Sequence, residues 1–209
     1  MSIDPALIPP PPALDQPLEG ARPSLETLAL LAQRRSTKSM LLGKPGPSDA
    51  QLDAMLRLAA RVPDHGKLGP WRFVILAGDA RARLGVQLAN VIAHDPGVDA
   101  GRIELERNRY MHAPVCVMVV SSVGDTAKIP EWEQRLSAGA ACFALLVSAH
   151  AMGFAGTWLT EWPVYDPRAR SVLGLKDGEH VAGFIHVGTP TQYVTERARP
   201  DLAGRISRL

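Results

Sequence analysis

The sequence predicts one domain that combines α-helices and β-strands. Its 209 residues fit a single hydrophobic core, because domains usually contain about 100–200 residues. Hydrophobic residues make up 46% of the chain and charged residues 21%, which is typical of a folded globular protein and not of a disordered one. Segments with apolar residues at helical spacing are interspersed with short continuous apolar runs, so both kinds of element are expected.

Residues 1–23 are expected to form an arm outside the core. They contain seven of the 18 prolines, including Pro9 to Pro12, and such a segment favours extended polyproline II structure. The arm could be a loose tail or a strap across a partner subunit, and the sequence does not choose between them. The first eight residues lack a basic region followed by an apolar stretch, so we expect a cytoplasmic protein without a secretory signal. Residues 24–209 are expected to form the domain.

Two helices are expected at the start of this domain. Ser24 is a good N-cap for a helix that runs to about Arg35, and Ser48 caps a second helix that stops near Val62. Pro63 ends the second helix, because the residue before a proline avoids the helical conformation. Two prolines and two glycines in residues 63–71 then predict a loop.

The rest of the chain predicts two further helices and four strands. The helices are expected at residues 79–93 and 131–152, and the strands at residues 72–77, 115–121, 155–160 and 181–187. We expect the last strand to end in the turn Gly188-Thr189-Pro190. Small residues along 138–144 permit close approach, so the long helix is expected to be central and packed against a symmetry mate. Cys116 and Cys142 lie in apolar runs and are expected to be buried and unpaired.

Composition and motif searches exclude several function classes. The net charge of +2 is too small and dispersed for a nucleic-acid surface, and no run is apolar and long enough for a membrane span. The chain contains no GxGxxG, GxxxxGK[ST], His-Glu-x-x-His, Cys-x-x-Cys or Gly-x-Ser-x-Gly motif. The six histidines are scattered without metal-ligand spacing, so no metal site is expected.

A compact group of three cations and two hydroxyls remains at the end of the first helix, Arg34-Arg35-Ser36-Thr37-Lys38. Phosphate recognition uses this combination, because arginine offers a charged fork and serine or threonine a short donor. A basic helix C-terminus also complements the helix dipole, so this group has a purely structural alternative. Arg197 and Arg199 form a second basic group, which could equally be solvated.

Four collinear segments together resemble a known family. The segments are Arg34-Arg35-Ser36-Thr37-Lys38, Val62-Pro63-Asp64-His65 followed by Gly69-Pro70-Trp71, Gly153-Phe154-Ala155-Gly156-Thr157-Trp158, and Val187-Gly188-Thr189-Pro190. They match the motifs of the FMN-dependent nitroreductase family, which the chain resembles over about Leu25 to Leu202. The Pro-Asp-His loop and Pro130-Glu131-Trp132-Glu133 make it most similar to the short YdjA-like NAD(P)H nitroreductase subgroup.

The resemblance implies a fold and an assembly. Family members have an α+β fold, a three-layer α/β/α sandwich around a mixed, largely antiparallel sheet. They are domain-intertwined homodimers in which each of two FMN sites is built from both subunits. The implied activity is an FMN-dependent NAD(P)H oxidoreductase, in which NADH or NADPH reduces FMN and the flavin passes electrons to a nitroaromatic, quinone or similar small-molecule acceptor by ping-pong turnover.

The resemblance also implies roles for individual residues, all in binding and none as a catalytic acid or base. Arg34 and Ser36 would bind the FMN phosphate together with Arg199 or Arg197, and Arg35 would belong to the same cofactor-binding group. Lys38 would reach the edge of the flavin ring that becomes anionic on reduction. The other subunit would supply His65 and Gly69, and the opposite face of the ring would lie against Trp158, Leu159 and Thr160.

Two departures keep other hypotheses open. Gly69 stands where the subgroup often has Gln, and Leu159 where it often has Arg, so we expect altered substrate or nicotinamide preference. The first alternative is a specialised relative that carries out dehydrogenation, dehalogenation or flavin fragmentation, for which residues 94–112 are the candidate cover. The second is a non-catalytic dimer. From the residues alone, Trp158 could be a core aromatic and His65 a loop residue without a flavin contact.

Overall fold

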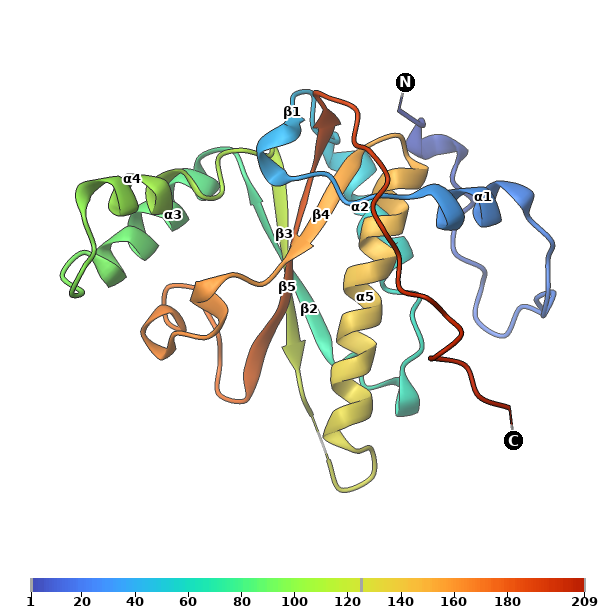
Figure 1. Cartoon of the computed structure of the whole chain (residues 1–209). Coiled ribbons are helices and arrows are strands. Elements are labelled where there is room, and N and C mark those ends of the chain that lie inside the picture. Colours follow the sequence, from blue (N-terminus) through green and yellow to red (C-terminus); the bar gives the residue numbers. More distant parts are fainter. Residues whose placement is uncertain (1, 125, 209) are drawn as a thin grey trace.

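A five-stranded sheet forms the centre of the computed structural model, which describes residues 2–124 and 126–208 (Figure 1). Residues 1 and 209, the outer limits of the predicted arm and domain, lie outside the described residues. The strands are β1 Leu42–Gly43, β2 Trp71–Ala77, β3 Val115–Ser122, β4 Ala155–Leu159 and β5 Glu179–Pro190. Their order is β1-β5-β3-β2, β4 also pairs with β5, and these pairings are antiparallel.

Helices cover both faces of the sheet. They are α1 Leu25–Gln33, α2 Asp49–Ala59, α3 Asp79–Ile92, α4 Ala100–Asn108 and α5 Glu131–Ala151. Short 3-10 turns occur at Pro5–Leu7, Ser39–Leu41, His65–Lys67, Trp162–Val164 and Pro167–Ala169. The helices α2 and α5 lie against one face, and α3 packs on the other with the segment between β4 and β5 (Figure 1). This arrangement confirms the expected α+β three-layer sandwich. Within the described residues, no helix is long and apolar enough to cross a membrane.

The central strand β3 shows why two cores form. It is a continuous apolar run, so consecutive side chains point to opposite faces and both faces are buried. Val115, Val117 and Val119 pack with α2 and α5. Their neighbours on the other face pack with α3 and the segment after β4, and these are Cys116, Met118 and Val120. Cys116 and Cys142 are both buried and free, as expected.

The predicted elements are found within a few residues of their expected bounds, with two corrections. The helix α2 begins at a complete capping box between Ser48 and Gln51. The predicted turn at Gly188-Thr189-Pro190 is wrong, because β5 continues through it and pairs with β1 and the start of β4. The segment 94–112 contains a helix, α4, that the sequence analysis did not predict.

The start of the arm contacts its own chain. The backbone N–H of Ile3 donates to the carbonyl of Met152 at the end of α5, over 3.0 Å. The side-chain amide of Gln51 in α2 donates to the carbonyl of Ile3 over 2.9 Å. Ile8 packs against the core beneath α2 and α5. The arm therefore ties the N-terminal end of α2 to the C-terminal end of α5.

Candidate functional site

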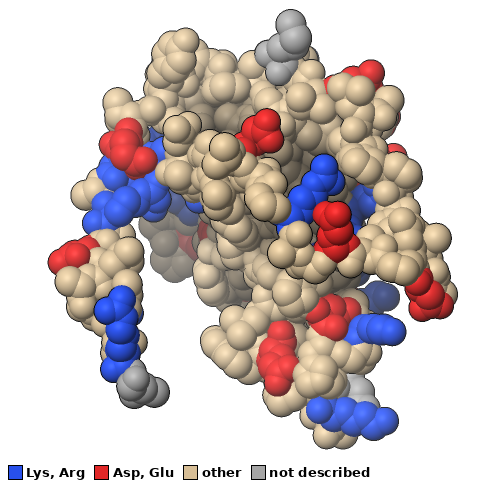
Figure 2. All heavy atoms as spheres, turned by 90° about the vertical axis from the view of Figure 1, so that its right-hand side faces the viewer, with Lys and Arg blue, Asp and Glu red and all other residues tan. Residues whose placement is uncertain are grey.

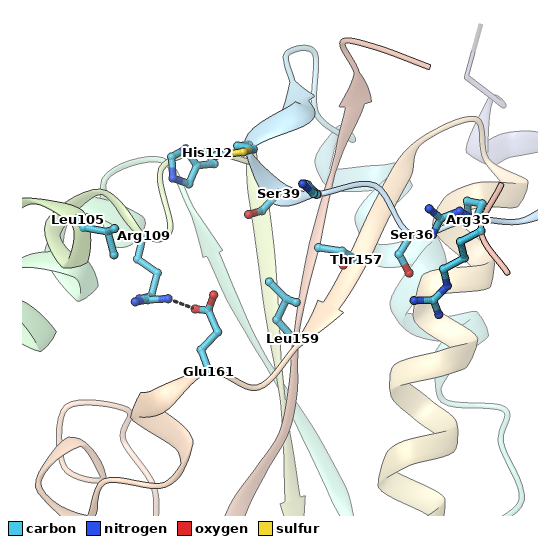
Figure 3. Close-up of a pocket in the computed structure, with 12 residues that line it drawn as sticks. Arg35, Ser36, Ser39, Leu105, Arg109, His112, Thr157, Leu159 and Glu161 are labelled. Carbon is cyan, nitrogen blue, oxygen red and sulfur yellow. Dashed lines mark ion pairs between the residues drawn. The ribbon is translucent and has the colours of Figure 1, made fainter. Parts of the chain in front are cut away.

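A cavity of about 540 Å³ lies between the segment after α1, the end of β4 and the segment around α4 (Figure 3). It is lined by Arg35, Ser36, Lys38, Ser39, Met40, Leu105, Arg109, His112, Thr157, Leu159, Glu161 and Arg197. Figure 3 shows Arg35 and Ser36 at one end, Thr157 and Leu159 in the middle, and Arg109 and His112 at the other end. A volume of this size is within the range of small-molecule and cofactor sites.

The chain immediately after α1 forms the cationic end. The helix stops at Gln33, and the extended backbone that follows is fixed by a bond from the Thr37 N–H to the Gly156 carbonyl in β4, over 3.0 Å. Thr37 is buried by this contact, whereas Ser36 and Lys38 on either side of it face the cavity. The Arg34-to-Lys38 motif thus buries Thr37 against the edge strand and presents Arg35, Ser36 and Lys38 to the cavity.

The C-terminal tail closes this end. The Nε of Arg35 donates to the Thr195 carbonyl over 3.0 Å and lies 3.7 Å from the Glu196 carboxylate. These contacts bring Arg197 to the cavity wall, whereas Arg199 pairs with Glu196 at 3.1 Å and lies outside the lining. The structure thus brings Arg197, and not Arg199, to the cavity in a single chain.

Arg34 points into a neighbouring hollow. Its guanidinium lies 5.7 Å from the centre of the Phe143 ring on α5, a cation–π contact. Its Nε is buried and has no hydrogen-bond partner. The neighbouring hollow also contains Thr37 and His150. A buried charged donor without a partner is costly, so this nitrogen is suited to an anionic ligand.

Strand β4 divides the other predicted residues between two faces. Leu159 and Thr157 point into the cavity, but Trp158 points away and donates from Nε1 to the Ala182 carbonyl over 3.0 Å. Gly183 makes this close approach possible, because a Cβ there would overlap the indole of Trp158. Thr160 lies beyond the strand and accepts a hydrogen bond from the hydroxyl of Tyr165 over 3.0 Å.

His65 and Gly69 lie far from the cavity. The Nδ1 of His65 is 2.7 Å from the carboxylate of Glu133 in the first turn of α5, and Gly69 has a positive φ of 58°. The cationic end instead meets the last turn of α5, where His150 lies 3.1 Å from the Arg35 carbonyl. Glu133 and His150 are 17 positions apart, or about 26 Å along a helix that rises 1.5 Å per residue. One chain therefore does not bring these two groups together.

The far end of the cavity is built around Arg109, which lies in the segment 94–112 that the sequence analysis named as a candidate cover without giving any of its side chains a role. The side chain of Glu106 has no solvent exposure. Its carboxylate accepts two hydrogen bonds from Arg109 and one from Trp162 over 2.8 Å, and it forms an ion pair with Arg102 at 2.9 Å. Burial raises the pKa of Glu106, but the bonds from Arg109 and Trp162 outweigh it, so the net pKa lies below the usual range. Glu106 therefore stays ionised and fixes the Arg109 side chain.

Glu161 completes this end. Its carboxylate lies 2.9 Å from Nη1 of Arg109, as the dashed line in Figure 3 shows. Burial opposes the charge of Arg109, but its bonds to Glu106 and its attraction to Glu161 raise its pKa further, so it remains a cation. The backbone of Glu161 has φ 60° and ψ 175°, a region that side-chain-bearing residues rarely adopt. Such strain is typical of functional positions.

The floor beside Thr157 is polar but uncharged. His186 is opposite Thr157 in β4 and Cys116 in β3, and it is 1% exposed. Burial, together with the neighbouring side chains of His112 and Arg109, lowers the pKa of His186 to about 4. The ring is therefore neutral near pH 7 and stacks on Tyr110 at 6.0 Å. In the described residues no group of three or more His, Cys, Asp or Glu could hold a metal ion.

The protein-family comparison decides the family. The model of the nitroreductase family matches residues 31–189. The chain belongs to the nitroreductase family. The Escherichia coli K12 protein named "Putative NAD(P)H nitroreductase YdjA" is 35% identical over 166 residues, 79% of this chain and 89% of that protein. A Haemophilus influenzae protein named "Putative NAD(P)H nitroreductase" is 32% identical over 177 residues, 84% of this chain and 94% of that protein.

Solved nitroreductase-like structures share the fold. A nitroreductase-like family protein from Bacillus cereus superimposes with a TM-score of 0.77 at 19% identity, covering 91% of this chain and 99% of that one. A nitroreductase with bound FMN from Bacteroides fragilis superimposes with a TM-score of 0.67 at 20% identity, covering 89% of this chain and 100% of that one. The family match begins at residue 31, so the proline-rich arm precedes the part that this chain shares with the family model.

Proposed function

We propose that the protein is an FMN-dependent NAD(P)H oxidoreductase of the nitroreductase type. The observation that carries this proposal is that the lining of the cavity changes along its length from cationic to apolar side chains. Its cationic end contains Arg35, Lys38 and Arg197 next to the hydroxyl of Ser36, which suits a phosphate dianion. Its middle is lined by Thr157 and Leu159, and the apolar side chain of Leu159 suits a planar ring. The FMN in the Bacteroides fragilis structure supports the same cofactor, and the names of the relatives support NAD(P)H as the electron donor.

The chain's own residues hold and tune the cofactor in this proposal. Arg35 and Ser36 bind the phosphate with Arg197, and the unpartnered Nε of Arg34 makes Arg34 a further candidate. When bound, FMN supplies hydride acceptance from NADH or NADPH and electron delivery to an acceptor. Lys38 stabilises negative charge on the reduced ring, because a fixed cation favours the anionic form.

The shape of the site supports ping-pong turnover. The cavity contains the proposed phosphate, ring and acceptor ends in sequence, so the donor and the acceptor would use the same open face in turn. The acceptors we propose are nitroaromatic compounds, quinones and related small planar electrophiles. The residues named here bind and position, and none acts as a nucleophile.

We further propose a homodimer whose interface completes each flavin site. The helix α1 buries none of its residues in the single chain, and its leucines are exposed, Leu25 at 83% and Leu28 at 63%. Along α5, Trp132, Leu136 and Phe143 recur at helical spacing and are also exposed. Figure 2 shows that large areas of this side carry no charged residue. An apolar face of this kind is typical of an obligate interface.

The separation of the two ends of α5 supports the same assembly. His65 and Arg35 contact Glu133 and His150, which are about 26 Å apart along α5, so the loop that contains His65 and Gly69 would contact a flavin only if it is held by the partner subunit. The departures at Gly69 and Leu159 would then lie on opposite faces of the ring, and we expect them to affect substrate preference more than flavin binding.

An anaerobic spectroscopic titration tests the proposed function. The purified protein is supplied with FMN, freed of excess, and treated with NADH and separately with NADPH. We expect a flavin absorption band that bleaches with at least one donor and returns on addition of a quinone. A protein that takes up no FMN would refute the assignment, and bound flavin that neither donor reduces would exclude NAD(P)H as the donor.

A further inference from the structure

The end of the cavity around Arg109 is not used by the proposed cofactor site. Figure 3 places Arg109, Leu105 and His112 opposite Arg35 and Ser36, with Leu159 between the two groups. If the cationic end holds the phosphate, the Arg109 end is the part of the cavity that remains for the acceptor. The charges at this end therefore bear on which acceptors can bind.

All three nitrogens of the Arg109 guanidinium already have partners. Nε and Nη2 bind the two oxygens of Glu106, whose side chain is completely buried. Nη1 pairs with Glu161 at 2.9 Å. The Arg109 side chain is 13% exposed and that of Glu161 is 22% exposed, so both charges are only partly screened by solvent. Glu161 thus occupies the one side of Arg109 that an acceptor anion could use.

We propose that Glu161 makes this end of the cavity selective for uncharged planar acceptors over acceptors that carry a carboxylate. The inference rests on the proposed function and adds a substrate class to it. Glu161 acts in two ways: it neutralises the Arg109 guanidinium that would otherwise attract an anion, and it repels a carboxylate placed beside it. The strained backbone places Glu161 at the start of the Trp162–Val164 turn, and the ion pair with Arg109 at 2.9 Å holds its carboxylate at the cavity wall.

The clean test variant is Glu161→Gln, because it removes the charge and keeps the shape. Changing Arg109 instead would leave the buried Glu106 without its main partner and would endanger the fold. The matched control is Glu104→Gln, which removes the same charge from the exposed side of α4, where Glu104 contacts Asn108 and lies outside the cavity lining.

The readout is the ratio of kcat/KM for 4-nitrobenzoate to that for 4-nitrobenzamide, which differ in charge but hardly in size. We expect this ratio to rise at least tenfold in Glu161→Gln and to stay at the wild-type value in Glu104→Gln. An unchanged ratio in Glu161→Gln, or an equal rise in both variants, would overturn the proposal.

A second measurement does not depend on turnover. Calorimetric titration of the full-length protein with benzoate and benzamide gives the ratio of the two dissociation constants. It should shift at least tenfold toward benzoate in Glu161→Gln alone. If the wild-type protein failed to reduce any acceptor while this shift was present, the proposed function would fail and the assignment of Glu161 would stand. Absence of the shift in an enzyme that does reduce nitrobenzamide would refute the assignment of Glu161 alone.

Discussion

The segment after α1 and the loop before β2 both carry motifs of the nitroreductase family, but only the first of them borders the cavity. The segment Arg34–Lys38 is fixed to β4 and borders a formed cavity. The loop that contains His65 and Gly69 projects from the opposite end of α5, where the His65 side chain is 62% exposed. The first region is preorganised around a cavity within one chain, whereas the second lies apart from that cavity, with His65 bonded to Glu133. This difference supports the proposal that two subunits share each site.

The largest expected effect comes from disrupting the apolar face of α5. In Leu136→Glu, a charge would replace a side chain that is 54% exposed in the single chain but buried in the proposed dimer. We expect a monomer that retains no flavin, measured by sedimentation and by the flavin absorption of the purified protein. The control is Val86→Glu on α3, where a similarly exposed aliphatic residue lies away from this face. A dimer that keeps its flavin in Leu136→Glu would refute the proposed interface.

Charge reversal at the preorganised region should have the next largest effect. Arg35→Glu replaces a cation of the proposed phosphate site, and charged hydrogen bonds contribute about 1.5–3 kcal/mol each. We expect FMN affinity to fall roughly a hundredfold, measured by quenching of FMN fluorescence, with the dimer intact. Arg83→Glu, on the exposed side of α3, serves as the control. Equal affinity in the two variants would remove Arg35 from the site.

A variant of Lys38 distinguishes an effect on the redox potential of the flavin from an effect on binding of its phosphate. Lys38→Met keeps the length of the side chain but removes the cation that would stabilise the reduced ring. We expect weaker FMN binding and a two-electron potential lower by about 30–60 mV, since 30 mV corresponds to about 1.4 kcal/mol. The measurement is a redox titration against a reference dye. An unchanged potential would mean that Lys38 does not face the ring.

The smallest effect on the site is expected from a charge pair at the other end of the sheet. Hydrogen bonds from Arg72 lower the pKa of Glu179 to about 2. The pair therefore stabilises the fold at any pH above the pKa that Glu179 has in the unfolded chain, and this stability is lost as the pH falls toward 2. Arg72→Gln should lower the free energy of unfolding by about 2 kcal/mol at pH 7, with the difference vanishing near pH 2. Denaturant titrations across this pH range measure it.

Flavin affinity should not change in Arg72→Gln at pH 7, because Arg72 and Glu179 lie outside the cavity lining. A large loss of flavin without a loss of stability would show that the two regions of the sheet are coupled in a way that the structure does not indicate.

Local signals explain how much of the fold could be predicted. Caps such as Ser48, the stop at Pro63 and the apolar run of β3 depend on neighbouring residues, so they can be recognised in the sequence. The extension of β5 through Pro190 depends on pairing with Leu42 and Gly43, about 147 positions away, and no local pattern indicates it. The helix α4 was missed because Glu106, its one buried residue, is charged and not apolar.

The candidate site shows the same limit. Ser36, Lys38 and Leu159 could be predicted, because they belong to short motifs and line the cavity. The far end could not, since Arg109 and Glu161 come together only when α4 and the end of β4 meet across the fold. Which of two adjacent arginines faces the cavity depends on how the backbone leaves α1, and a motif does not specify that.

A hybrid dimer tests most directly whether the site is shared between subunits. One subunit carries Arg35→Glu, and the other carries Gly69→Asp, which adds a charge to the loop with a residue that tolerates a positive φ. Each homodimer should be inactive, since both of its sites are damaged. In the hybrid, both changes fall in one shared site and the other site is intact, so we expect about half of the wild-type nitroreductase activity. An inactive hybrid, or a fully active Gly69→Asp homodimer, would contradict the account.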